Sequence, residues 1–226
     1  MSLRPQSPVP SSSSSVSSAA SAAAVRRASM RWRTADVAVG AALGVACGVI
    51  FWGFNFAYAA ISPVLSAILP GVTSIMHAVW YFSGPLAMLI LRKPGAAMFV
   101  NVVTVLAQMV MGTQYDIVMT FASAILQGLF TELPFYVTRL RVFTLPITMI
   151  SGVCVALEYG VFLLFTRYQG VSLLSPRGMV HIITEVIGGV VIAGLATWFL
   201  FMAIARTGAL DRFASGRAVR ARAVEA

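Results

Sequence analysis

The sequence predicts an all-α integral membrane protein, a bundle of six transmembrane helices with both termini in the cytoplasm. Of its 226 residues, 59% are hydrophobic and only 10% are charged, whereas a soluble domain carries about 25% charged residues. The apolar residues fall into stretches near the ~20 residues that a helix needs to cross a bilayer. Turn-forming and charged residues separate these stretches.

Six apolar stretches account for most of the chain. The third is short, and the segment from Ser62 to Gly71, which contains two prolines, is expected to be a loop between the first two spans. The spans are predicted over residues 36–60, 71–91, 95–112, 116–138, 143–166 and 179–205.

Three regions follow from composition. Residues 1–30 are rich in Ser and Ala and contain no acidic residue, so we expect a disordered cytoplasmic tail. Residues 31–206 form the six-helix membrane domain. Residues 207–226 are predicted to be a basic cytoplasmic tail.

The basic residues lie mainly on one side of the predicted membrane domain. With the N-terminus inside, fourteen Lys and Arg residues fall on the cytoplasmic side and two, Arg167 and Arg177, fall outside. This asymmetry is the positive-inside pattern. Because the charges lie next to apolar spans, we expect them to meet the lipid bilayer and not nucleic acid.

Polar residues inside the spans indicate a ligand pocket. An acidic residue in the middle of a membrane helix costs ~2.5–3.5 kcal/mol, so such residues are expected to face a protein interior. Aromatic and hydrogen-bonding residues are predicted at similar depth in the outer half, which is typical of a small-molecule site. The candidate substrate-binding residues are Asn55, His77, Trp80, Tyr81, Gln108, Gln127, Glu158 and Glu185. The spacing of His77, Trp80 and Tyr81 places all three on one helix face.

Several of these residues have a structural alternative. Asn55, Gln108 and Gln127 could join helices by hydrogen bonds. His181 and Glu185, four residues apart, are expected to bond each other; neither a metal site nor a cofactor is expected. Glu132 is expected to pair with Arg92 or Lys93.

The first span carries two stripes of small residues. They consist of Ala38, Ala42 and Ala46 and of Gly40, Gly44 and Gly48. Such stripes let helices approach closely. One stripe is explained by packing within the chain, and the two together suggest a face that docks on a partner.

Catalytic motifs are not found in the sequence. Lys93 is the single lysine and follows Arg92, so the phosphate-binding G-x-x-x-x-G-K-[ST] motif is missing, as are HExxH and G-x-S-x-G. No catalytic residue is predicted, and active transport would need energy from another subunit or from ion coupling. Two rival hypotheses remain, a membrane enzyme that uses Glu158 and Glu185 as acid and base, and an intramembrane scaffold.

Three segments resemble one family of transport proteins. RKPGAA at residues 92–97, Gln127-Gly128 followed by Glu132, and LDRFASGR at residues 210–217 are similar to the YkoE family, as are Trp32-Arg33-Thr34, Asp36 and Trp80. Members are substrate-binding (S) components of energy-coupling factor (ECF) transporters for hydroxymethylpyrimidine or related thiamine precursors.

The resemblance implies a non-catalytic importer subunit of the bacterial plasma membrane that captures a vitamin precursor from outside. It also implies an ECF T component and two ATPase subunits as partners, docking through the small residues of the first span, and an outer lid at residues 62–71. The family commonly has acidic residues where this chain has Asn101 and Gln108. Their replacement by amides favours a neutral aminopyrimidine over a cationic thiamine-like ligand.

Overall fold

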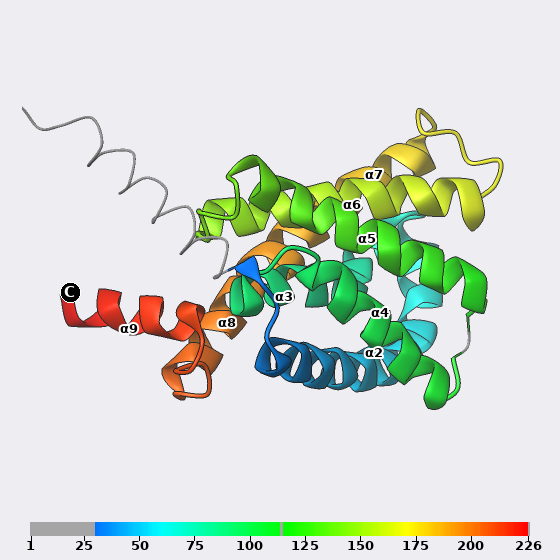
Figure 1. Ribbon diagram of the computed structural model, residues 1–226. Helices are drawn as coiled ribbons and strands as arrows, with labels where there is room; N and C mark the ends of the chain where they lie inside the picture. The colour runs from blue at the N-terminus through cyan, green and yellow to red at the C-terminus, as the bar shows by residue number, and fades with distance from the viewer. Residues whose placement is uncertain (1–29, 114, 226) are drawn as a thin grey trace, which may run out of the picture. The chain divides into compact units, whose positions relative to one another are not determined.

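The computed structural model describes residues 30–113 and 115–225. All regular structure in these residues is helical, which confirms the all-α prediction. The segment Arg33–Ala226 forms one compact unit, and Figure 1 shows its helices running side by side. The predicted disordered tail lies outside the described residues, apart from Met30.

The described helices follow the predicted spans closely. In chain order they are α2 (Thr34–Ile68), the 3₁₀-helix η1 (Val72–Trp80), α3 (Ser83–Leu91), α4 (Ala96–Val110), α5 (Ile117–Val137), α6 (Leu145–Thr166), α7 (Pro176–Gly188), the π-helix η2 (Gly189–Ala196), α8 (Thr197–Arg206) and α9 (Ala214–Glu225). Within the described residues, five helical stretches are long and apolar enough to cross a membrane, because η1 joins α3 and α7 continues through η2 into α8. The remaining predicted span, α4, is also apolar but has only 15 residues.

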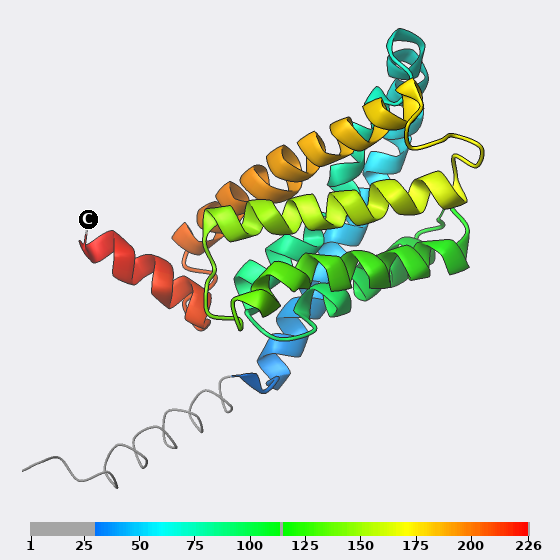
Figure 2. The same cartoon turned by 90° about the horizontal axis from the view of Figure 1, so that it is seen from above.

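The helices alternate in direction, so the connections gather at two ends of the bundle (Figure 2). One end, here called the basic end, holds the start of α2, the α3–α4 and α5–α6 connections and the end of α8. Its basic residues include Arg92, Lys93, Arg139, Arg141 and Arg206. The grouping matches the charge asymmetry of the sequence, and assignment of this end to the cytoplasm stays a prediction.

The prediction of a loop over residues 62–71, between the first two spans, is wrong for most of that segment. Residues Ser62–Ile68 continue α2, and only three residues, Leu69–Gly71, separate it from η1. Pro63 is tolerated inside the helix because membrane-embedded helices accommodate proline through neighbouring contacts and local adjustment. Val64 and Ile68 present apolar side chains on the exposed surface, so the apolar, lipid-facing side of α2 continues past Pro63. A lid made of a loop over residues 62–71 is therefore not supported.

The glycine stripe of α2 packs inside the chain. A Cβ atom at Gly44 would lie 2.7 Å from the Cβ of Val103, and one at Gly48 would lie 2.7 Å from the Cβ of Ala107. The Thr104 hydroxyl on α4 also donates to the Gly44 carbonyl at 3.1 Å. Gly40, Gly44 and Gly48 therefore form the α2–α4 interface, and their predicted role on a partner-docking face is wrong. Ala38, Ala42 and Ala46 lie on the exposed side of α2.

Glu132 does not take the role expected of it. Its carboxylate accepts hydrogen bonds from the backbone N–H groups of Gly95, Ala97 and Met98 at 2.8, 2.9 and 3.3 Å. The first N–H groups of a helix lack partners within the helix and carry partial positive charge, so a buried carboxylate is stabilised there. Lys93 instead forms an ion pair with Asp36, with Nζ and Oδ2 3.3 Å apart.

The LDRFASGR segment packs against the end of α3. The Ser215 hydroxyl donates to the Ile90 carbonyl at 2.8 Å, and both Ser215 and Leu210 are buried. Part of the predicted C-terminal tail is thus an ordered extension of the membrane domain.

Candidate functional site

A cavity of about 360 Å³ opens near the end of the bundle opposite the basic end. Helices α2, η1, α3, α4, α5 and α6 all contribute to its wall. Its volume falls in the range of small-molecule sites, and its mixed lining of aromatic and polar groups is typical of them. The polar lining residues are His77, Ser83, Asn101, Thr104, Gln108, Asp116, Thr120, Ser123, Gln127, Thr166 and Arg167; the aromatic ones are Phe51, Tyr58, Trp80, Tyr115, Tyr159, Phe162 and Tyr168.

Trp80 is fixed as one aromatic wall of the cavity. Its indole N–H donates to the Asn55 Oδ1 at 2.8 Å, and its ring stacks on His77 with centroids 5.6 Å apart. Tyr58 meets it edge-on at 4.8 Å. The 3₁₀ geometry of η1 explains why His77 and Trp80 share a face, since three residues complete one turn. The indole is therefore held ready for a flat ligand.

Amides and hydroxyls form a second, polar part of the lining. The Ser83 hydroxyl donates to Asn101 Oδ1 at 2.9 Å, and the Gln127 amide donates to the Ser123 hydroxyl at 2.8 Å. The Gln127 carbonyl and the Gln108 amide add further hydrogen-bonding groups to the lining. These groups can form hydrogen bonds with donors and acceptors on a ligand without adding charge to the cavity.

The mouth of the cavity is built from the connections at the ends of α4 and α6. The Arg167 guanidinium lies 5.9 Å from the centroid of the Tyr115 ring. Burial is the largest cause of the raised pKa of Tyr115, so its phenol is neutral at neutral pH. Asp116, the N-cap of α5, accepts from the Met119 N–H at 2.8 Å. Sequence reasoning missed these residues because they lie in connections, where helix periodicity gives no signal.

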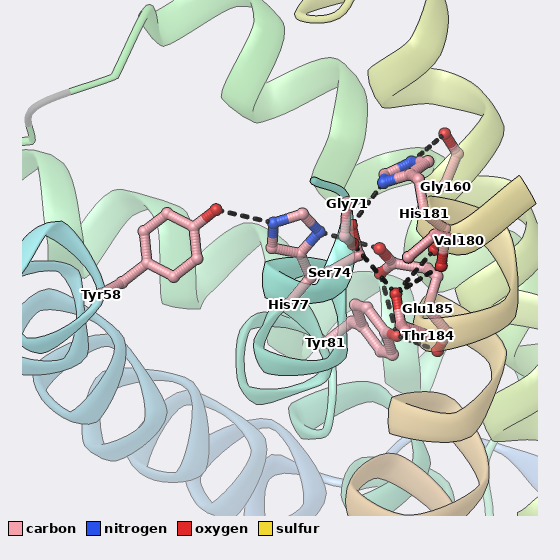
Figure 3. A network of polar contacts seen from close by, with 10 residues as sticks. All are labelled: Tyr58, Gly71, Ser74, His77, Tyr81, Gly160, Val180, His181, Thr184 and Glu185. Atoms are coloured by element: carbon pink, nitrogen blue, oxygen red, sulfur yellow. Dashed lines mark hydrogen bonds and ion pairs between the residues drawn. The ribbon is translucent and has the colours of Figure 1, made fainter. Parts of the chain in front are cut away.

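Behind the wall lies a buried polar network (Figure 3). His77 Nε2 is 3.0 Å from the Tyr58 hydroxyl, and His77 Nδ1 is 2.8 Å from Glu185 Oε2. The Tyr81 hydroxyl donates to Glu185 Oε1 at 3.1 Å. The carboxylate, fully shielded from solvent, is thereby held by two side chains from η1 and the residue that follows it.

The predicted substrate-binding residues separate into two groups. His77, Trp80, Gln108 and Gln127 line the cavity, whereas Asn55, Tyr81, Glu158 and Glu185 are not among its lining residues. Asn55 and Glu185 stand behind Trp80 and His77, to which they are bonded.

Tyr81 contacts the same neighbours as His77, because both side chains bond the Glu185 carboxylate and both rings meet Tyr159 edge-on. Unlike His77 and Trp80, however, the buried Tyr81 is not among the residues that line the cavity. The Glu158 carboxylate oxygens are buried and have no hydrogen-bond partner.

The expected hydrogen bond between His181 and Glu185 is also wrong. His181 Nδ1 bonds the Ser74 hydroxyl, and its Nε2 lies 3.0 Å from the Gly160 carbonyl. Glu185 instead faces η1 (Figure 3). Helical spacing makes a contact between residues four apart possible, but His181 bonds partners on η1 and α6, and Glu185 bonds His77 of η1 and Tyr81, which follows it.

The described part of the chain contains no cluster of three or more His, Cys, Asp or Glu side chains arranged to hold a metal ion. His77 is the single imidazole among the described residues that line the cavity. Metal-binding sites generally need three or four such ligands.

Comparison with known proteins places the chain among transport proteins. The profile of the family described as "ABC-type cobalt transport system, permease component" matches residues 35–158. The Bacillus subtilis (strain 168) protein YkoE, named as an HMP/thiamine permease, is 24% identical over 191 residues, which span 84% of this chain and 92% of that protein. This similarity confirms the resemblance to YkoE.

A solved structure supports the same assignment at the level of fold. The crystal structure of an S component of an ECF transporter superposes with a TM-score of 0.76 at 23% identity, covering 86% of this chain and 98% of the other. The fold is therefore that of an ECF S component, in a multi-pass membrane protein. Because the family profile covers more than half of the sequence, the chain belongs to the family of ABC-type cobalt transport system permease components.

Proposed function

We propose that this protein is the substrate-binding S component of an ECF-type importer and that it captures hydroxymethylpyrimidine or another thiamine-related precursor. The observation that carries the proposal is the cavity near one end of the bundle, whose lining combines the Trp80 ring with hydrogen-bonding amides. An aromatic wall stacks on a flat ring, a contact worth ~1–3 kcal/mol for nucleobases. The name of the YkoE relative points to the same class of ligand.

The charge of the lining favours a neutral ligand. Asn101 and Gln108 contribute amides, and the carboxylates Glu158 and Glu185 are not lining residues. Asp116, at the mouth, is the one carboxylate among the described lining residues and has Arg167 in the same lining. A cationic thiamine would lose hydration without gaining a counter-charge deep in the site. A neutral aminopyrimidine can exchange its hydrogen bonds with water for bonds to amides.

The transport cycle requires partners that supply energy. We assign that role to a T component and two ATPase subunits, with the basic end and both termini on the cytoplasmic side and with six spans, α4 included, crossing the membrane. The cavity then opens outwards. The exposed stripe of Ala38, Ala42 and Ala46 provides a smooth face on α2 for the T component.

The paired-carboxylate enzyme hypothesis finds no support in this geometry. General acid–base catalysis requires both groups to reach a bound substrate. Glu185 is fully buried against His77 and Tyr81, and the Glu158 oxygens are buried outside the cavity lining.

A ligand-thermostability assay on the purified protein tests the proposal. Hydroxymethylpyrimidine at 100 times its Kd should stabilise the folded protein by about 2.7 kcal/mol, which raises Tm. Thiamine should give a smaller rise at the same concentration. If neither hydroxymethylpyrimidine nor thiamine nor their relatives change Tm, the assignment to thiamine precursors is wrong.

A further inference from the structure

The imidazole of His77 joins the cavity to the buried network behind it. Figure 3 shows Tyr58 on one side of the ring and Glu185 on the other. The Tyr58 hydroxyl lies 3.0 Å from Nε2, and Glu185 Oε2 lies 2.8 Å from Nδ1. Tyr58 and His77 line the cavity, whereas Glu185 does not. The ring therefore has one nitrogen directed to the network and one directed to the ligand side.

The contacts of Glu185 select the tautomer of His77. An ionised carboxylate can only accept hydrogen bonds, so the ring nitrogen that faces it carries the proton. A neutral imidazole with its proton on Nδ1 has a lone pair on Nε2. In the structure this lone pair accepts a hydrogen bond from the Tyr58 hydroxyl. A ligand that reaches Nε2 must bring its own N–H or O–H donor.

The position of Glu185 is itself fixed by contacts between α7 and its neighbours. The Thr184 hydroxyl donates to the Gly71 carbonyl at 3.0 Å, and His181 bonds Ser74 and the Gly160 carbonyl. A carboxylate inside a membrane span is costly unless donors satisfy it. Here the Tyr81 hydroxyl and His77 Nδ1 supply the two donors. Such a fully satisfied network holds one arrangement of its members.

We infer that His77 determines ligand specificity by offering Nε2 as an acceptor to an amino group on a flat heteroaromatic ligand, and that Glu185 is the positioning residue that acts through it. The inference rests on the proposed function, since it concerns the same cavity. It narrows the substrate class to heteroaromatic amines and disfavours the corresponding oxo compounds, whose carbonyl would face a lone pair. The Tyr58 hydroxyl occupies the acceptor until the ligand amine replaces it.

The variant Glu185→Gln tests the positioning role. Its amide oxygen can still accept from Tyr81, while its NH₂ group donates to Nδ1 and moves the imidazole proton to Nε2. We expect the wild-type protein to bind hydroxymethylpyrimidine about tenfold or more tightly than the analogue with an oxo group in place of the amine. The variant should lower this ratio at least tenfold. An equal loss of affinity for both ligands would show a merely structural role and overturn the inference.

Nitrogen-15 NMR of labelled histidine measures which nitrogen of His77 is protonated, and it does so without relying on ligand affinity. The wild-type spectrum should show His77 protonated on Nδ1, and the spectrum of Glu185→Gln should show it protonated on Nε2. A His77→Phe variant identifies the resonance. A wild-type ring that carries a proton on Nε2, alone or together with one on Nδ1, would overturn the inference.

A second variant removes the competing donor and leaves the contacts of Glu185 with His77 and Tyr81 intact. Tyr58→Phe should tighten binding of hydroxymethylpyrimidine by a few fold, because the ligand amine no longer displaces the Tyr58 hydroxyl. Tyr136→Phe, an exposed tyrosine near the end of α5, is the matched control and should leave affinity unchanged. Weaker binding by Tyr58→Phe would contradict the displacement step.

The outcomes separate this inference from the proposed function. If the wild-type protein binds neither the amino compound nor its oxo analogue, the proposed function fails. If it binds both with equal affinity, the proposed function stands and the inference about His77 fails.

Discussion

Replacing Glu132 with glutamine removes the negative charge that α5 places against the N-terminus of α4. The wild-type carboxylate accepts three backbone hydrogen bonds, from Gly95, Ala97 and Met98. A glutamine keeps one acceptor oxygen and turns an NH₂ group towards at least one of these donors. The loss of a charged hydrogen bond costs ~1.5–3 kcal/mol and an unsatisfied buried N–H costs ~1–3 kcal/mol. We therefore expect the variant Glu132→Gln to lose about 3 kcal/mol of stability.

Thermal unfolding in detergent, followed by intrinsic fluorescence, measures this loss. For a chain of this size, 1 kcal/mol corresponds to roughly 2–4 °C, so Tm should fall by roughly 6–12 °C. Leu133→Ala, at an exposed position next to Glu132, is the control and should shift Tm much less. Ligand affinity should change little, because Glu132 lies at the basic end, away from the cavity. An unchanged Tm, or a loss of affinity at unchanged Tm, would refute the assignment of Glu132 as a helix clamp.

Four further substitutions have defined outcomes. Gly44→Leu should destabilise the protein strongly in the same thermal assay, because even a Cβ atom there would press against α4. Ala46→Leu, on the exposed side of α2, should keep stability and ligand affinity but abolish uptake in cells that contain the coupling subunits. Gln108→Glu adds a negative charge to the cavity and should raise the affinity for thiamine relative to hydroxymethylpyrimidine by about tenfold, which competition binding would detect. Gly152→Ala should lower Tm by several degrees, because the new Cβ would meet the Gly189 carbonyl of η2 at an impossible distance. Wild-type behaviour of Gly44→Leu or Gly152→Ala would contradict the observed helix packing, and unchanged ligand preference in Gln108→Glu would remove that residue from the site.

The sequence was sufficient to predict the helical membrane fold because the cost of polar groups in lipid leaves strong traces in hydropathy. It also predicted that Trp80, His77, Gln108 and Gln127 lie at similar depth, and these four residues line the cavity. The end of the first helix could not be placed from the sequence. A proline ends most helices in soluble proteins, whereas Pro63 is accommodated inside this one.

Side-chain partners were less predictable than depth. The sequence predicted that Glu185 would bond His181 and that Glu132 would pair with a basic residue. In the structure, Glu185 bonds His77, and Glu132 accepts hydrogen bonds from the N-terminus of a helix. Both outcomes depend on which helices are neighbours, and that information is not contained in local spacing. The 3₁₀ turn before Tyr81 was equally hidden, because the pattern of apolar residues in η1 is compatible with an α-helix.

Isothermal titration of the purified protein with hydroxymethylpyrimidine tests the central claim most directly, namely that the aromatic and amide-lined cavity binds a flat neutral precursor. The account predicts saturable binding of one ligand per chain. Trp80→Ala should weaken this binding at least tenfold, as expected for the loss of a stacking wall, and Phe165→Ala on the exposed face of α6 should not affect it. Absence of saturable binding, or equal binding by the wild-type and Trp80→Ala proteins, would contradict the claim.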